Sequence, residues 1–442
     1  MQDAPAEKFI IDGLGGKKTL SGSIRISGAK NAALKLMAAS ALFDGPITLT
    51  NVPKIEDVKR MEGILESSGA AVSFFGDNSL KIDPRKMRSG EMPEEISKRL
   101  RASIVATGPF LARFGSVSFP HPGGCVIGAR PIDLFLLGFQ KMGARVSVEK
   151  RGNKDAYVIR AGAGKLRGAE IFFKNQSVTA TETFMMAAAL AHGKTTIKNA
   201  AMEPEIAHLA EFLSRGGARI KGAGTTTIEV DGTGGEFLRA GGEPFAVMPD
   251  RIEAGSFLIL GALAARELSI TGCNPAHLES LIEILAEAGV QMKIGAAEIT
   301  VRGKRIGIPK AYGAVSVKTH EYPGFPTDLQ APMVVFLTQA KGESTIFETI
   351  FEGRLSYAEQ LSRMGASIEA LDTHRVRVKG PSPLSGKILE SPDLRAGLAF
   401  VIASIIAKGE SVVHNVYNID RGYEDLDGRL SKIGVSIRRV AA

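Results

Sequence analysis

A sixfold internal repeat constrains the fold of this 442-residue chain more than any other feature of its sequence. A segment with helical periodicity, a glycine, an alanine or valine, and a short alternating segment recur six times. The glycines of the six copies are Gly69, Gly143, Gly217, Gly289, Gly365 and Gly434. Successive glycines are 74, 74, 72, 76 and 69 residues apart, and each stands where the C-cap of a helix is expected. The spacing predicts six copies of one α/β unit of about 72 residues, which divide naturally into two domains of three.

A second helix, followed by a short strand, is predicted within each copy. The helices are predicted over residues 32–42, 104–113, 183–192, 255–266, 333–340 and 397–408, and the strands over 46–49, 116–119, 195–198, 268–271, 344–347 and 411–414. These helical segments are apolar on nearly every face. Such a pattern is typical of helices buried inside a domain rather than lying on its surface.

Polar and charged residues gather where these buried helices begin. Helix N-termini carry partial positive charge and free N–H groups, so several of them converging at one place would form an anion site. Lys30, Arg101 and Arg395 are cations at such positions, where they oppose the helix dipole, and each therefore indicates another anion nearby. Ser177 and Asp393 are explained equally well as simple N-caps.

Residues 121–131 form a predicted loop of about ten residues, because two prolines bracket it and three glycines lie inside it. Cys125, one of two cysteines in the chain, lies near its centre, and Arg130 follows five positions later. A nearby guanidinium lowers the pKa of a thiol and favours the reactive thiolate. The alternative interpretation is a glycine-rich turn in which Cys125 is an incidental small apolar residue.

Composition excludes several classes of function. The 55 basic and 47 acidic residues give a net charge of +8, which favours an anionic ligand, but the aromatic content of 6% and the absence of Trp argue against nucleic-acid binding. The two cysteines, Cys125 and Cys273, predict neither a disulfide framework nor a zinc site, and no metal site is expected. No apolar run reaches the roughly 20 residues of a membrane span, and no signal-peptide core is present at the N-terminus. We therefore expect a soluble protein of a reducing compartment.

Several of these segments resemble one enzyme family. The chain is similar to the UDP-N-acetylglucosamine enolpyruvyl transferases over residues 9–440, and the string Pro122-Gly123-Gly124-Cys125 is the most specific part of the match. The other matching segments are residues 27–34, 101–103, 128–131, 249–253, 325–328, 348–354, 393–396 and 419–424.

This resemblance implies an α/β fold of two inside-out α/β barrel domains, each with threefold pseudo-symmetry, that close over a cleft. It predicts a catalytic domain over residues 29–248, which carries the Cys125 loop as a lid. Residues 1–28 and 249–442 are predicted to form the second enolpyruvyl transferase domain, with crossings near residues 28 and 248. This architecture agrees with six repeats in two groups of three.

The resemblance also implies an activity. Members of the family transfer the enolpyruvyl group of phosphoenolpyruvate to the 3-hydroxyl of UDP-N-acetylglucosamine and release phosphate, by addition and then elimination. No cofactor is implied, and the partners are the two small-molecule substrates, without nucleic acid or membrane. The family acts in the cytoplasm at the first committed step of peptidoglycan precursor synthesis, which serves cell wall biogenesis, cell shape and cell division, and it is the target of fosfomycin.

The resemblance also implies roles for particular residues. Cys125 matches the acid that protonates the enol carbon, and Asp328 matches the base that takes the proton of the sugar hydroxyl. Lys30, Arg130 and Arg421 match cations that bind phosphate, and Arg354 and Arg395 match those near the carboxylate, where a guanidinium can donate two hydrogen bonds. The positions expected to bind substrate are Lys30, Asn31, Arg101, Arg130, Pro131, Asp133, Leu134, Ser177, Val178, Thr179, Asp250, Asp328, Ile350, Arg354, Asp393, Arg395 and Arg421.

The chain departs from the family at two positions beside the expected sugar-nucleotide pocket. Thr179 stands where a glycine is common, and Asn175 stands where some members have a lysine. Two other functions remain open at this point. One is the sister enolpyruvyl transferase that acts on shikimate phosphate, which lacks the Cys125 loop, and the other is an inactive paralogue that binds a nucleotide-sugar as a regulator.

Overall fold

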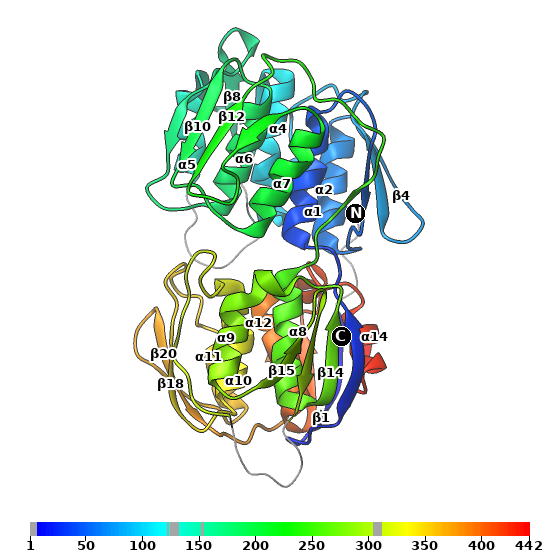
Figure 1. The fold of residues 1–442 in the computed structure, drawn as a ribbon, viewed down its shortest axis with the longest axis vertical. Helices are drawn as coiled ribbons and strands as arrows, with labels where there is room; N and C mark the ends of the chain where they lie inside the picture. The colour runs from blue at the N-terminus through cyan, green and yellow to red at the C-terminus, as the bar shows by residue number, and fades with distance from the viewer. Residues whose placement is uncertain (1–6, 122, 124–131, 152–153, 304–311) are drawn as a thin grey trace. The chain divides into compact units, whose positions relative to one another are not determined.

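The computed structural model describes residues 7–121, 123, 132–151, 154–303 and 312–442. The chain has a mixed α/β fold and divides into two compact units (Figure 1). We call residues 28–248 the middle unit, and residues 7–27 together with 249–442 the end unit. Within the described residues, no helix is long and apolar enough to cross a membrane.

Each unit contains three small sheets among its described residues. In the middle unit their strand orders are β13-β3-β5-β4, β6-β8-β7 and β11-β12-β10-β9. The strands are β3 (Ile47–Thr50), β4 (Ala71–Phe75), β5 (Ser79–Asp83), β6 (Ser116–Phe119), β7 (Ala144–Arg151), β8 (Lys154–Ala161), β9 (Glu170–Phe172), β10 (Lys194–Lys198), β11 (Arg219–Lys221), β12 (Thr227–Asp231) and β13 (Phe245–Ala246).

The end unit repeats this plan, with the orders β21-β22-β1-β23, β15-β16-β14-β2 and β17-β18-β20-β19. Its strands are β1 (Glu7–Leu14), β2 (Leu20–Arg25), β14 (Ala265–Thr271), β15 (Gln291–Ile294), β16 (Glu298–Arg302), β17 (Val317–Lys318), β18 (Gly342–Phe347), β19 (Ser367–Ala370), β20 (Arg375–Gly380), β21 (Ile388–Glu390), β22 (Lys408–His414) and β23 (Ser436–Ala441). Strand β1 pairs antiparallel with both β22 and β23, so the first and last of the described strands share one sheet.

The core of each unit is built on inner helices that contact one another. In the middle unit they are α1 (Lys30–Ala39), which continues into the 3₁₀ turn η1 (Ser40–Leu42); η2 (Arg101–Ala106) with α4 (Thr107–Phe114); and α6 (Val178–Ala189). In the end unit they are α8 (Arg251–Ala264), η5 (Thr327–Leu329) with α10 (Gln330–Leu337), and α12 (Leu394–Ile406). Every residue of α10 and α12 is buried, which confirms the prediction from their all-round apolar pattern.

The remaining helices are more exposed and follow the inner ones in each repeat. They are α2 (Glu56–Ser67), α3 (Glu94–Arg99), α5 (Asp133–Lys141), α7 (Pro204–Arg215), α9 (Glu279–Glu287), α11 (Ala358–Arg363), α13 (Tyr417–Asp420) and α14 (Leu426–Lys432), with 3₁₀ turns η3 (Gly162–Gly164) and η4 (Pro275–Leu278). All six repeat glycines have positive φ, between 84° and 108°, as the predicted helix C-caps require.

The predicted starts of the inner helices are wrong by a few residues. The helical segments, with their leading 3₁₀ turns, begin at residues 30, 101, 178, 251, 327 and 394, rather than at 32, 104, 183, 255, 333 and 397. The polar residues of the predicted loops form the N-cap or the first turn of each helix, because these positions leave N–H groups available and need no apolar face. Lys30 and Arg395 therefore belong to helices rather than to the loops before them.

Close backbone contacts fix the two points at which the chain crosses from one unit to the other. The chain leaves the end unit after Ser27 and returns to it at Pro249. A Cβ atom on Gly28 would lie 1.8 Å from the carbonyl oxygen of Asn51, so no larger residue fits there. The next residue, Ala29, donates its N–H to Met248 over 2.7 Å and fixes the start of α1 within the middle unit.

Candidate active site

In the end unit, two arginines hold one carboxylate among the predicted site residues. Asp328 lies in η5; its Oδ1 accepts from Nη2 of Arg354 at 2.8 Å, and its Oδ2 accepts from Nε and Nη2 of Arg395 at 3.1 and 2.9 Å. Both arginine side chains are buried, since 6% of Arg354 and 7% of Arg395 is exposed. The side chain of Asp328 is 28% exposed. Desolvation raises the pKa of Asp328, but the charges of Arg395 and Arg354 outweigh it and hold the pKa well below its usual range.

Arg395 is positioned by the start of α12. Asp393 is the N-cap of this helix, and its side chain accepts from the N–H groups of Arg395 and Ala396. The Nη1 of Arg395 donates to the hydroxyl of Tyr423 at 2.9 Å, which fixes the other end of the guanidinium. The anion predicted beside this cation is Asp328.

Arg354 is positioned from the segment that follows β18. Its Nη1 donates to the hydroxyl of Thr327 at 2.6 Å, while its Nη2 contacts Asp328. Thr327 in turn donates to the buried carboxylate of Glu348 at 2.7 Å. Thr327, Glu348 and Tyr423 were not predicted as site residues, although they lie within the matching segments 325–328, 348–354 and 419–424.

In the middle unit, Lys30 begins α1 and pairs with Asp57 in the first turn of α2, with 2.6 Å between Nζ and Oδ2. Asp57 is 1% exposed and was not predicted; it is the buried anion expected beside this cation. One turn further along α1, Lys35 lies 3.3 Å from Glu182 of α6. Burial raises the pKa of Glu182 to about 8. Glu182 is a charged residue within the largely apolar sequence of α6, and this pattern could have predicted a buried ion pair.

The other described site residues lie at element ends. Ser177 and Asp250 are the N-caps of α6 and α8; Ser177 accepts from Ala180, and Asp250 accepts from Ile252 and Glu253. N-capping is a sufficient structural reason for Ser177 and Asp250 at these positions. Their roles in substrate binding remain predictions. The remaining positions are Asn31 in α1, Arg101 at the start of η2, Asp133 and Leu134 at the start of α5, Val178 and Thr179 in the first turn of α6, Ile350 after β18, and Arg421 at the C-cap of α13. Cys125, Arg130 and Pro131 lie outside the described residues.

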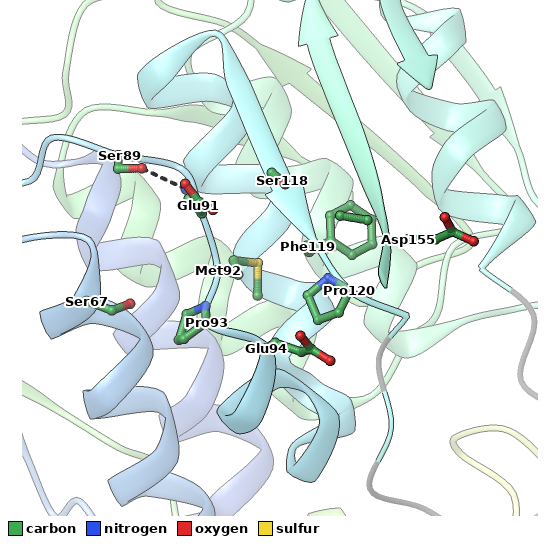
Figure 2. A pocket seen from close by; sticks show the side chains of 11 residues that line it. Ser67, Ser89, Glu91, Met92, Pro93, Glu94, Ser118, Phe119, Pro120 and Asp155 are labelled. Atoms are coloured by element: carbon green, nitrogen blue, oxygen red, sulfur yellow. Dashed lines mark hydrogen bonds between the residues drawn. The ribbon is translucent and has the colours of Figure 1, made fainter. Parts of the chain in front are cut away.

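A separate hollow of about 420 Å³ opens on the middle unit, between the end of α2, residues 89–94 and strands β6 and β8 (Figure 2). Its lining includes the carboxylates of Glu91, Glu94 and Asp155 and none of the predicted site residues. Carboxylates repel phosphate groups, so this hollow is unsuited to a phosphate-bearing substrate.

Among the residues that the structure describes, no group of three or more His, Cys, Asp or Glu side chains is placed to hold a metal ion.

Comparison with known proteins identifies the family. The model of the EPSP synthase (3-phosphoshikimate 1-carboxyvinyltransferase) family matches residues 14–430. The chain belongs to the EPSP synthase family. Within this family it is similar to proteins named UDP-N-acetylglucosamine 1-carboxyvinyltransferase, and this confirms the resemblance predicted from its motifs.

Three such EPSP synthase family members cover nearly the whole chain. The protein of Campylobacter hominis is 43% identical over 97% of this chain and 98% of its own length. Those of Solibacter usitatus and Desulforapulum autotrophicum are 41% and 42% identical, over 98% and 96% of this chain and 100% and 98% of their own lengths.

Solved structures of the EPSP synthase family agree with the fold. The enolpyruvyl transferase NikO from Streptomyces tendae matches with a TM-score of 0.83 and 25% identity, over 99% of this chain and 100% of its own. An EPSP synthase from Acinetobacter baumannii matches with a TM-score of 0.71 and 18% identity, over 98% of this chain and 100% of its own, and supports the fold alone.

Proposed function

We propose that this chain transfers the enolpyruvyl group of phosphoenolpyruvate to the 3-hydroxyl of UDP-N-acetylglucosamine and releases phosphate. The reaction would be the first committed step of peptidoglycan precursor synthesis in the cytoplasm. In the same proposal, the middle and end units are the catalytic and second enolpyruvyl transferase domains, each an inside-out barrel of three repeats. Near-complete coverage by relatives with this name, at 41–43% identity, supports the assignment.

The observation that carries the chemistry is the Asp328 carboxylate between Arg354 and Arg395. A carboxylate whose pKa lies so low is a weak base, because its charged form is stabilised by both guanidinium groups. The same two groups are well suited to bind the carboxylate of phosphoenolpyruvate, since each can donate two parallel hydrogen bonds.

These two properties suggest how the site prepares its base. When the substrate carboxylate binds to Arg354 and Arg395, it replaces Asp328 as their partner. Asp328 then loses stabilising charge, and its pKa rises toward the range in which a carboxylate accepts a hydroxyl proton. The base is therefore formed only when phosphoenolpyruvate is present.

The addition step needs an acid as well as this base. The oxygen of the sugar 3-hydroxyl attacks C2 of phosphoenolpyruvate and gives its proton to Asp328, while C3 takes a proton from Cys125. In the elimination step C3 gives a proton back to the Cys125 thiolate, the double bond re-forms, and the C2–O bond to phosphate breaks. The departing phosphate takes the proton that Asp328 accepted, so both groups return to their starting states. We assign the phosphate to Lys30, Arg130 and Arg421, whose positive charges stabilise the leaving group.

The sugar-nucleotide contacts are proposed from four segments of the middle unit and three positions of the end unit. They are Asn31, Arg101, Asp133, Leu134, Ser177, Val178 and Thr179, with Asp250, Ile350 and Asp393 from the end unit. Thr179 lies in the first turn of α6 and is half-buried, so its side chain can affect affinity without disturbing the core.

The test is phosphate release from phosphoenolpyruvate, with and without UDP-N-acetylglucosamine, together with the mass of the sugar product. We expect release only with the nucleotide-sugar, and a gain of one enolpyruvyl group on that sugar. Asp328→Asn is expected to lower kcat by about 10²–10⁴. Asp372→Asn, which alters an exposed Asp paired with Arg375 in the same unit, should leave kcat unchanged.

Two outcomes would overturn the proposal. Release with shikimate 3-phosphate, but not with UDP-N-acetylglucosamine, would identify the sister enolpyruvyl transferase activity. Binding of UDP-N-acetylglucosamine without phosphate release would identify a regulatory paralogue.

A further inference from the structure

Glu348 is a fully buried carboxylate at the end of β18, and both of its oxygens accept hydrogen bonds. Oε1 accepts from the backbone N–H groups of Ile350 and Phe351, at 2.8 and 3.1 Å. Oε2 accepts from the hydroxyl of Thr327, at 2.7 Å. One side chain thus joins the segment that carries Ile350 to the turn that carries Asp328.

The chemistry of the groups fixes the direction of each hydrogen bond. An arginine only donates and a carboxylate only accepts, so the Thr327 hydroxyl must accept from Arg354 and donate to Glu348. Arg354 then has its Nη1 on Thr327 and its Nη2 on Asp328. The orientation of the Arg354 fork therefore depends on the Thr327 hydroxyl, and that hydroxyl depends on Glu348.

We propose that Glu348 and Thr327 are positioning residues for the transfer reaction, and that together they set the direction in which Arg354 presents its guanidinium to Asp328. This inference rests on the proposed function, because it assumes that Asp328 and Arg354 take part in the transfer. It goes beyond that function by assigning roles to two residues that contact neither the reacting atoms nor, in the proposal above, the substrates.

A purely structural role for Glu348 makes a different prediction. If the carboxylate only caps the backbone at Ile350 and Phe351, removing the Thr327 hydroxyl should not affect the reaction. Thr327→Val keeps the size of the side chain and leaves both cap hydrogen bonds in place. It removes only the connection from Glu348 to Arg354.

The charged and titratable groups around this connection define the expected pH effect. Arg354 and Arg395 face Asp328; Tyr423 and Asp250 lie beside Arg395, and Tyr357 lies beside Arg354. Loss of the Arg354 contact leaves Asp328 with one guanidinium partner, so its pKa rises. The acidic limb of the kcat/KM profile, which reports the free enzyme, should therefore move to higher pH.

The experiment compares Thr327→Val, Thr327→Ser and Glu348→Gln with the unaltered chain. We expect Thr327→Val and Glu348→Gln to lower kcat by about 10- to 100-fold. In both variants Arg354 would hold the carboxylate of phosphoenolpyruvate in a different direction, and small misplacements of reacting groups have effects of that size. Thr327→Ser, which keeps the hydroxyl, should restore both kcat and the pH profile. Thr300→Val is the matched control, because the hydroxyl of the buried Thr300 also takes part in a side-chain hydrogen bond, with Ser269 at 2.8 Å.

A Thr327→Val variant with unaltered kcat and pH profile would overturn the inference and leave Glu348 as a loop cap. An unaltered chain that releases no phosphate would instead overturn the proposed function. In that case crystal structures of the Thr327 variants decide the positioning role. Arg354 should leave Asp328 in Thr327→Val and keep it in Thr327→Ser, and an unmoved Arg354 in both would contradict the inference.

Discussion

Lys30 and Asp57 form an ion pair of 2.6 Å between the first turns of two consecutive helices, α1 and α2. A lysine at a helix N-terminus opposes the helix dipole, and the buried Asp57 supplies the compensating negative charge. Removal of one partner from a buried pair leaves the other without compensation, which typically lowers stability by about 3–5 kcal/mol.

We therefore expect Asp57→Asn to destabilise the chain by about 3 kcal/mol and to raise the KM for phosphoenolpyruvate, because Lys30 loses the group that orients it. Chemical denaturation and steady-state kinetics check the two effects. Glu56→Gln is the matched control, since Glu56 precedes Asp57 but is 30% exposed. A lower KM in Asp57→Asn would show instead that Asp57 competes with the phosphate for Lys30.

Cys273 should be inert toward alkylating reagents. It is 4% exposed, its thiol donates to the carbonyl of Ile270, and burial raises its pKa, so little thiolate forms. With limiting reagent, peptide mapping should find the label on Cys125, and the same result is expected for fosfomycin. Cys273→Ser should leave the labelling rate unchanged, and equal labelling of both thiols would contradict the assignment of Cys125 as the reactive cysteine.

Glu182 should make the stability of the chain depend on pH. Its pKa is raised to about 8 in the fold by burial, against an ordinary value of 4.5, so the folded state keeps a proton that the unfolded state releases. The contribution of Glu182 to the free energy of unfolding is therefore greatest below about pH 4.5, and it falls as the pH rises toward 8. The loss between pH 5 and pH 8 should be on the order of 3 kcal/mol.

Glu182→Gln should remove most of this slope, because the amide does not titrate. Denaturant unfolding at pH 5, 7 and 9 measures it. Glu211→Gln, at an exposed position of α7, should keep the slope of the unaltered chain. An unchanged slope in Glu182→Gln would show that Glu182 remains ionised beside Lys35.

Arg439 should stabilise the end unit through three acidic partners. It donates to both oxygens of Asp420 at 2.8 Å, to Glu7 at 2.8 Å and to Asp427 at 3.0 Å, and so joins β1, α13 and α14 to β23. The side chain is 25% exposed, so solvent screens the network, and we expect Arg439→Ala to lower the free energy of unfolding by about 1–2 kcal/mol. Arg438→Ala, at the exposed neighbouring position, should change it little, and equal effects would rule out the network as the cause.

The parts of the fold that the sequence predicted are those governed by local backbone chemistry. Gly143 and Gly365, like the other repeat glycines, end helices in a left-handed conformation that other residues adopt with strain. The all-round apolar pattern likewise predicted that α12 is buried. The helix starts were predicted less well, because a polar first turn has no apolar periodicity to recognise.

The candidate site was predicted residue by residue, but its connections were not. Asp328 and Arg395 are 67 positions apart, and only the packing of α10, which follows η5, against α12 brings them together. Glu348 and Asp57 were assigned no role from the sequence, although Glu348 lies in a segment that matches the family, because a single acidic residue is usually a solvated surface charge. The side chains that they contact, Thr327 and Lys30, are apparent only in the folded chain.

The pairing of β1 with β22 and β23 has a consequence for the order in which the protein folds during synthesis. The middle unit is complete once Met248 has left the ribosome, and its contacts lie within one continuous stretch of chain. Strand β1 leaves the ribosome first, yet its sheet partners follow about 400 residues later. The nascent chain therefore carries β1 without these sheet partners while about 400 residues are synthesised, so this sheet of the end unit forms only after the middle unit is complete.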